Sequence, residues 1–193
     1  MDRDELTEEK AGALDASFVR RYEATARELE QRVAADARVA GVTLAQRLPL
    51  LPSGGGAIEL DDIGSGGPAA ERELAVATSA VDLDFFEVFQ TPVVAGRGFV
   101  PQDTGAGART VLVNQLFVDQ ILGGRNAVGR RIRYTVGQYS QPDGEPGPWF
   151  EIIGVVRDLV RDPGAPMSLD NPAKPFVYHT LGSRRVHTYP LYT

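Results

Sequence analysis

The run Phe150–Val156, "FEIIGVV", is the feature that most constrains the fold of this 193-residue chain. It carries apolar residues on both of its alternating faces, and Glu151 is its only charged residue. A strand with one solvated face alternates between apolar and polar residues, whereas a strand buried on both faces is almost continuously apolar. The run therefore predicts a central strand of a sheet.

The composition is that of a folded, mildly acidic protein. Hydrophobic residues make up 42% of the chain, and the formal net charge is −6. This length allows one large domain or two small lobes, and the negative charge argues against a nucleic-acid partner. The chain has no cysteine, which excludes thiolate metal sites, cysteine nucleophiles and disulfides.

Two features bear on the membrane. No run reaches the ~18 apolar residues that a membrane-spanning helix needs. The polar start "MDRDELTEEK" lacks the apolar segment of a secretory signal peptide. We expect the chain as given to be a soluble piece.

One long amphipathic helix is predicted over residues 5–36. Its apolar residues recur every three or four positions, which places them on one stripe of a helix. The stripe consists of Leu14, Phe18, Tyr22, Ala26, Leu29 and Val33. We expect this stripe to be buried against another part of the protein.

The remainder of the chain predicts strands with a few short helices, and so an α+β fold. Asp82 and Asn114 are expected to cap two of the helices. Residues 53–67, rich in glycine, are expected to form a flexible excursion and a candidate contact loop. The predicted strands are 42–48, 71–81, 93–94, 110–113, 129–139, 150–156 and 176–180, and the predicted short helices are 83–89 and 115–122.

Three acids, Asp82, Asp84 and Glu87, are the first candidates for chemistry. A pair of carboxylates supports general acid–base catalysis when burial shifts one pKa. No His, Lys or Tyr stands near them in the sequence to complete such a set. We favour a structural interpretation, in which these acids cap and flank the first turn of a helix.

The other candidate sites are weaker. His179 and His187 are the only histidines, which is too few for a zinc site without added carboxylates, and a structural role is favoured. The glycine runs Gly54–Gly56 and Gly64–Gly67 lack the Gly-Lys-Ser/Thr of a phosphate-binding loop, and Ser65 lacks the flanking pattern of a nucleophile elbow. The residues thus predict no catalytic, cofactor-binding or metal site.

Four blocks in order resemble the extracytoplasmic core domain of MacB-like and FtsX-like ABC transporter permeases. They are "VDLDFFEVFQTPVVAGRGFVPQD", "VLVNQLFVDQIL", "NAVGRRIRY" and "FEIIGVVRDLV". Ahead of them, "ARELEQRVAADARVAGVTLAQRLPL" resembles the segment in which a helix leads into the family's first strand. Together these segments cover residues 26–178.

The first block also predicts a folded corner. Gly96 and Gly98 are expected to adopt backbone conformations that other residues resist, so that Arg97 projects from a tight bend and pairs with Asp103. Phe85, Phe86 and Phe99 are expected to anchor the corner in the core. Gly129 is expected to break the chain before a strand, and Gly154 to leave room for a packed neighbour.

The resemblance implies a two-lobe architecture. A porter-like α/β lobe would comprise residues 5–81 and 150–193, and a smaller mixed α/β lobe of the Sabre type would be inserted at residues 82–149. The domain would lie outside the bacterial inner membrane, between two transmembrane helices that are not in this sequence.

The resemblance also implies a non-catalytic function. The domain would transmit ATP-driven conformational change to an extracytoplasmic substrate or partner, in efflux, export or lipoprotein transport. Its partners would be a second permease copy, a cytoplasmic ATPase that performs all ATP hydrolysis, and an adaptor, lipoprotein or peptide. No cofactor is expected.

Two alternatives stay open. A stand-alone periplasmic ligand-binding module would require a deep apolar pocket. A hydrolase would use Asp82, Asp84 or Glu87.

Overall fold

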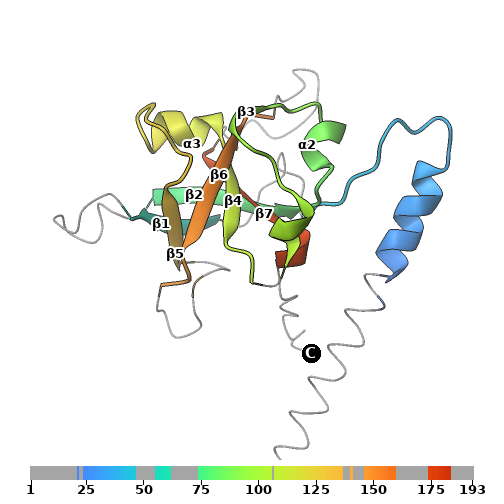
Figure 1. Ribbon diagram of the computed structural model, residues 1–193, viewed down its shortest axis with the longest axis horizontal. Coiled ribbons are helices and arrows are strands. Elements are labelled where there is room, and N and C mark those ends of the chain that lie inside the picture. Colours follow the sequence, from blue (N-terminus) through green and yellow to red (C-terminus); the bar gives the residue numbers. More distant parts are fainter. Residues whose placement is uncertain are drawn as a thin grey trace, which may run out of the picture. The chain divides into compact units, whose positions relative to one another are not determined.

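The computed structural model describes residues 21, 24–46, 55–61, 74–105, 107–136, 140, 146–159 and 174–183 (Figure 1). Contacts divide the chain into two compact units. One consists of residues 1–42 and 185–193, and the other of residues 43–184.

The first unit contains an α-helix over residues 24–34. It confirms the C-terminal part of the predicted long helix, whereas residues 5–20 lie outside the described part of the chain. Leu29 and Val33 of the apolar stripe are 61% and 39% exposed, so the burial predicted for these two residues is not observed. Within the described residues, no helix is both long enough and apolar enough to span a bilayer.

The second unit is built on one seven-stranded sheet with the strand order β3-β6-β4-β7-β2-β1-β5. Its strands are β1 (Gly55–Leu60), β2 (Leu74–Val81), β3 (Val93–Gly96), β4 (Thr110–Asn114), β5 (Arg131–Val136), β6 (Phe150–Val156) and β7 (Phe176–Thr180). Its helices are α2 (Phe85–Val88) and α3 (Gln115–Gln120), with 3₁₀ turns η2 (Pro101–Thr104) and η3 (Leu181–Ser183). The mixed α/β class is therefore confirmed.

β6 is an interior strand of this sheet, paired along both edges, as its composition predicts. It pairs in parallel with β4 on one side, and on the other side it pairs antiparallel with both β3 and β5. Because β5 pairs with β6 as well as with β1, six strands close a ring of pairings and β3 remains as an extra edge strand. Figure 1 shows β4, β5 and β6 crossing β1, β2 and β7.

The core has two apolar clusters on opposite faces of β4. Val111 and Val113 belong to one cluster, together with Phe117 of α3 and Ile152 of β6. Leu112, which points to the other face because side chains alternate along a strand, belongs to the second cluster. That second cluster holds the aromatic residues Phe85, Phe86, Phe176 and Tyr178.

Most of the predicted short elements are confirmed. Asn114 caps α3 as expected, since its side chain accepts a hydrogen bond from the Phe117 amide at 3.0 Å. Gly123 and Gly124, which follow this helix, have φ values of +60° and +79°, conformations that favour glycine at a helix C-terminus. Gly129 has φ +87° immediately before β5.

Two strand predictions are wrong. Residues 55–60, expected to lie in a flexible excursion, form β1, which pairs with β2 and β5 and buries Ile58 and Leu60. The glycines around this segment concealed the strand, because two apolar residues at alternate positions are too few to outweigh them. Conversely, the strand predicted over 42–48 is reduced, within residues 42–46, to a single bridge between Ala45 and Val81.

The predicted division into two lobes is not confirmed. β3, β4 and β5, from the proposed insertion at 82–149, share one sheet with β1, β2, β6 and β7. The lobe boundaries stay a prediction, and the sheet itself belongs to the single unit of residues 43–184.

Candidate functional site

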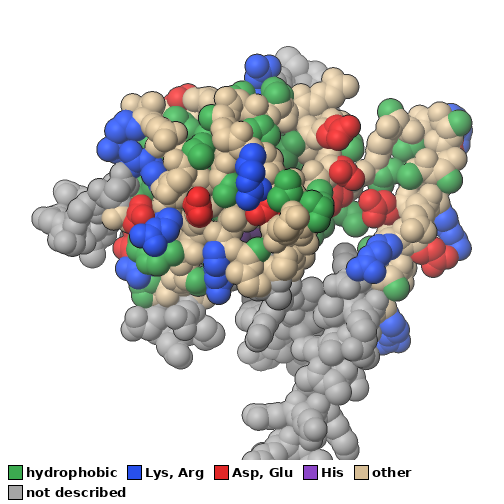
Figure 2. Space-filling view, in the orientation of Figure 1, with side chains coloured by type: hydrophobic (Ala, Val, Ile, Leu, Met, Phe, Trp, Pro, Cys, Tyr) green, Lys and Arg blue, Asp and Glu red, His purple; other side chains and the backbone are tan. Residues whose placement is uncertain are grey.

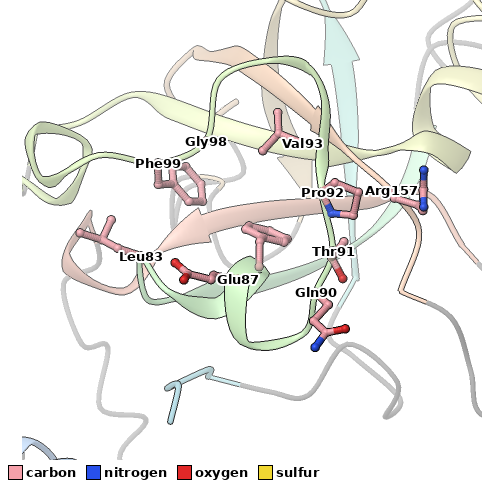
Figure 3. A pocket seen from close by; sticks show the side chains of 10 residues that line it. Leu83, Glu87, Gln90, Thr91, Pro92, Val93, Gly98, Phe99 and Arg157 are labelled. Atoms are coloured by element: carbon pink, nitrogen blue, oxygen red, sulfur yellow. The ribbon is translucent and has the colours of Figure 1, made fainter. Parts of the chain in front are cut away.

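An open groove of about 550 Å³ lies beside α2 and β3 (Figure 3). Its apolar wall includes Phe86, Val93 and Phe99, whereas Glu87 and Arg157 bring opposite charges to it. Figure 3 shows Glu87 and Arg157 toward opposite ends of the groove, with Thr91 and Pro92 between them. Its remaining lining residues are Leu83, Gln90, Thr91, Pro92 and Gly98.

A turn with an unusual backbone forms the lower wall of the groove. Gln90, which follows α2, has φ +50° and is the only non-glycine residue with positive φ in the described part of the chain. Its amide donates to the Glu87 carbonyl at 2.9 Å, and the Thr91 amide donates to the Phe86 carbonyl at 2.8 Å. A residue with a left-handed backbone conformation at a helix C-terminus is usually glycine. Here it is glutamine, which places a polar side chain on the groove wall.

The exposed large apolar residues of this unit come from one stretch of sequence, and one of them, Val93, lines the groove. In the described part of the unit of residues 43–184, every exposed large hydrophobic residue lies between positions 88 and 100. We call this cluster the α2–β3 patch. It consists of Val88, Phe89, Val93, Val94 and Val100. Figure 2 shows acidic side chains on the surface over α2, close to apolar ones.

The sequence did not predict this patch. The block "VDLDFFEVFQTPVVAGRGFVPQD" predicts a corner anchored in the core, and that holds for Phe85 and Phe86, which are buried, whereas Phe99 is half-buried against the same cluster. The patch is exposed because β3 is an edge strand, and all four residues of β3 are exposed. β3 has only four residues, which is too short a run for the apolar residues of its two faces to show whether the strand is central.

The three candidate acids do not converge on one site. Asp82 was expected to cap a helix, but its carboxylate accepts hydrogen bonds from the Thr43 hydroxyl and the Leu44 amide. Asp84 takes the N-cap position of α2 without a side-chain hydrogen bond to the helix. Glu87 is exposed on the groove wall. The helix cap predicted for Asp82 is therefore wrong, because Asp84 takes that position and Asp82 binds residues 43 and 44 instead.

Asp82 joins residues 43–46 to the end of β2. Besides the two carboxylate bonds, the Asp82 amide donates to the Leu44 carbonyl at 2.9 Å, and the Gln46 amide donates to the Ala80 carbonyl at 2.7 Å. Because α2 begins directly after this junction, the segment that enters the unit is anchored next to the groove.

The predicted pair of Arg97 and Asp103 is confirmed. The Arg97 guanidinium donates to both carboxylate oxygens of Asp103, at 2.6 and 3.1 Å. The Val100 amide and the Thr110 hydroxyl donate to the same carboxylate at 2.9 and 3.0 Å. These bonds, led by those from Arg97, hold the pKa of the Asp103 carboxyl below its usual range.

Two glycines allow this corner to lie close to β6. Gly96 has φ +69°, and a Cβ atom there would collide with the carbonyl oxygen of Ile153. A Cβ atom on Gly154 would meet the carbonyl oxygen of Arg97 and lie 2.9 Å from Leu112 Cδ2. Gly98 has no such requirement, because its φ lies outside the left-handed region and the nearest atom to a Cβ would be 3.6 Å away. The expectation for Gly98 is therefore wrong.

The histidine on β7 lies in the core. His179 is fully buried, and its Nε2 atom lies 2.9 Å from the hydroxyl of the equally buried Tyr134. The Phe150 ring packs edge-on against it, with ring centroids 4.9 Å apart. This confirms the structural role favoured for His179. In the described residues no group of three or more His, Asp or Glu side chains is placed to hold a metal ion.

The remaining candidates have separate outcomes. Gly55 and Gly56 belong to β1 and thus form no flexible turn. His187, Ser65, Gly54 and Gly64–Gly67 lie outside the described residues.

Three solved structures show similarity to this chain. The periplasmic region of MacB from Actinobacillus actinomycetemcomitans is 12% identical, with a TM-score of 0.49, over 80% of this chain and 54% of that one. The extracellular domain of the noncanonic ABC-type transporter YknZ from Gram-positive bacteria is 13% identical, with a TM-score of 0.47, over 79% and 60%. A domain of a putative permease from Porphyromonas gingivalis is 16% identical, with a TM-score of 0.44, over 79% and 57%.

The chain thus spans less than two thirds of the length of these solved chains. No curated protein matches it at a significant level. A family model described as the MacB-like periplasmic core domain matches residues 15–190, which is almost the whole chain. The chain therefore belongs to the family of MacB-like periplasmic core domains found in ABC transporter permeases.

Proposed function

We propose that this domain transmits ATP-driven movement of a permease to an extracytoplasmic substrate or partner, in export, efflux or lipoprotein transport. The observation that carries the proposal is the family match over residues 15–190. The domain would lie on the outer side of the inner membrane, joined to helices of the full-length permease. A cytoplasmic ATPase, as a separate domain or subunit, would perform all nucleotide hydrolysis, and the domain itself would be non-catalytic.

The construction of the unit of residues 43–184 supports this role. A domain that passes on movement must resist bending, and here six strands close a ring of pairings. The contact of Gly96 with Gly154 and the hydrogen bond from the Arg97 amide to the Ile153 carbonyl tie β3 and its following loop to β6. At the start of this unit, residues 43 and 44 are held by their hydrogen bonds to the Asp82 carboxylate.

The alternative of a stand-alone ligand-binding module requires a deep apolar pocket. Small-molecule sites bury most of the ligand surface, whereas the groove beside α2 is open and has charged residues at two ends. The groove is better suited to a macromolecular partner.

The proposal is tested on the full-length transporter with its ATPase in lipid nanodiscs. Gln120→Cys, at the exposed end of α3, gives one labelling site per domain, because the chain contains no cysteine. Spin-label distances between the two copies are measured without nucleotide, with ATP and in a hydrolysis-deficient ATPase variant. We expect the distance distribution to change on ATP binding and to return after hydrolysis. One distribution in all three states would contradict the proposal.

A further inference from the structure

We propose that the groove and the α2–β3 patch form a self-complementary interface with a second copy of this chain. This inference rests on the proposed function, in which two permease copies act together, and it names the surface through which their extracytoplasmic domains meet.

The patch has the character of a protein interface. Monomeric domains rarely gather exposed large apolar residues in one place, and such clusters mark interaction surfaces when polar residues surround them. Here the exposed large apolar residues described in the unit of residues 43–184 lie within a single stretch of 13 positions, from Val88 to Val100. Glu87 of α2 and its N-cap residue Asp84 are both acidic, which makes an anionic lipid surface an unfavourable partner.

The sheet edge lies within the same surface. β3 is the terminal strand in the order of the sheet, and its residue Val94 is 46% exposed. An uncovered apolar edge strand promotes association with another chain, and proteins normally protect it with charge. The residues of β3, "VVAG", carry no charge.

The charges of the groove select a second copy as the partner. Glu87 and Arg157 lie toward opposite ends, both are exposed, and neither forms an ion pair with another described residue. A twofold axis that crosses the groove at right angles sets it antiparallel to its copy. Glu87 of each chain then meets Arg157 of the other, and the apolar residues between them face their equivalents.

The test uses the complete chain and charge reversal. Sedimentation equilibrium is measured up to about 1 mM protein, because a small interface forms a weak dimer. We expect a dimer whose dissociation constant rises about tenfold or more in Glu87→Arg and in Arg157→Glu, since each change places like charges opposite each other. The double variant restores opposite charges in exchanged positions, and its dissociation constant is expected to return to near the starting value.

Two further variants define the surface. Asp119→Arg makes the same charge change as Glu87→Arg on the exposed end of α3 and is expected to leave the dimer unchanged. Val94→Asp is expected to abolish the dimer without lowering the melting temperature of the monomer, because Val94 is on an exposed edge.

Three results would overturn the inference. They are a monomer at every concentration, a dimer that neither charge reversal weakens, and a double variant as weak as the single ones. The last result would show that Glu87 and Arg157 do not face each other across the interface. None of them affects the nucleotide-linked distance change in the full transporter, so the interface and the proposed function fail independently.

Discussion

Asp103 illustrates how one residue organises the corner that follows β3. Its side chain is 5% exposed and accepts four hydrogen bonds, two of them from an arginine that is itself 48% exposed. Its backbone carbonyl accepts a fifth, from the Thr180 hydroxyl at 2.9 Å. The residue therefore connects η2, β4 and the end of β7.

Replacing Arg97 by alanine should destabilise the domain. A buried carboxylate that loses its charged partner keeps its desolvation cost, and the expected loss is about 1–3 kcal/mol of unfolding free energy. Arg32→Ala is the matched control, because it removes an exposed ion pair with Glu28 on the helix over residues 24–34, worth about 0.3–0.5 kcal/mol. Urea unfolding measures both variants, and equal losses would contradict the structural role of Asp103.

The contribution of Asp103 should depend on pH. Its pKa is lower in the folded chain than its ordinary value of 3.8, so the unfolded chain binds more protons in the interval between the two values. The stabilisation is therefore fully present above about pH 4 and is lost as the pH falls through the folded-state pKa. We expect the difference in unfolding free energy between the wild type and Asp103→Asn to shrink from pH 7 to pH 3. A constant difference would show that the charge contributes nothing.

At the scale of elements, β6 and β1 show what sequence patterns predict. The position of β6 was predictable because its apolar residues lie on both faces of the strand. β1 was not, because only its burial between β2 and β5 distinguishes Ile58 and Leu60 from two apolar residues in a loop. The pairing of Arg97 with Asp103 was predictable from the bend at Gly96 and the short separation of the two residues in sequence, whereas the hydrogen bonds that Asp82 accepts from residues 43 and 44 span about 40 positions.

The close approach of β3 to β6 makes Gly154 irreplaceable. An added methyl group would meet the Arg97 carbonyl and Leu112, and overpacking of this kind costs about 1–3 kcal/mol. Gly98→Ala is the control, since its methyl group would make only an ordinary contact with Val93. Thermal unfolding is expected to show a lower melting temperature for Gly154→Ala and little change for the control. Similar melting temperatures would exclude the tight crossing.

The anchoring of residues 43–46 by Asp82 is tested by hydrogen exchange. In Asp82→Ala the Leu44 amide loses its acceptor, so we expect exchange at residues 43–46 to accelerate at least about tenfold, which corresponds to the loss of about 1.4 kcal/mol. Asp84→Ala, which removes a carboxylate without a capping bond, should leave exchange there unchanged. Equal rates in the two variants would remove Asp82 from this role.

For the whole molecule, family and fold class were predictable, but the arrangement of the sheet was not. The four sequence blocks map to α2 with β3, β4 with α3, β5, and β6, and each block was recognisable locally. The closing contact between β5 and β6 joins residues 131 and 132 to residues 150 and 151, and no local pattern encodes it. The two lobes expected from the family resemblance stay a prediction. In the structure, one sheet contains strands from both of the proposed lobes.

The central claim is that residues 43–184 pass on ATP-driven movement as a rigid body. The most direct measurement places two spin labels in one domain of the full transporter, by Gln102→Cys in η2 and Gln120→Cys in α3, both exposed. We expect the distance within the domain to stay constant through the ATP cycle while the distance between the two copies changes. A distance within the domain that changes with nucleotide, or a distance between copies that does not, would contradict the claim.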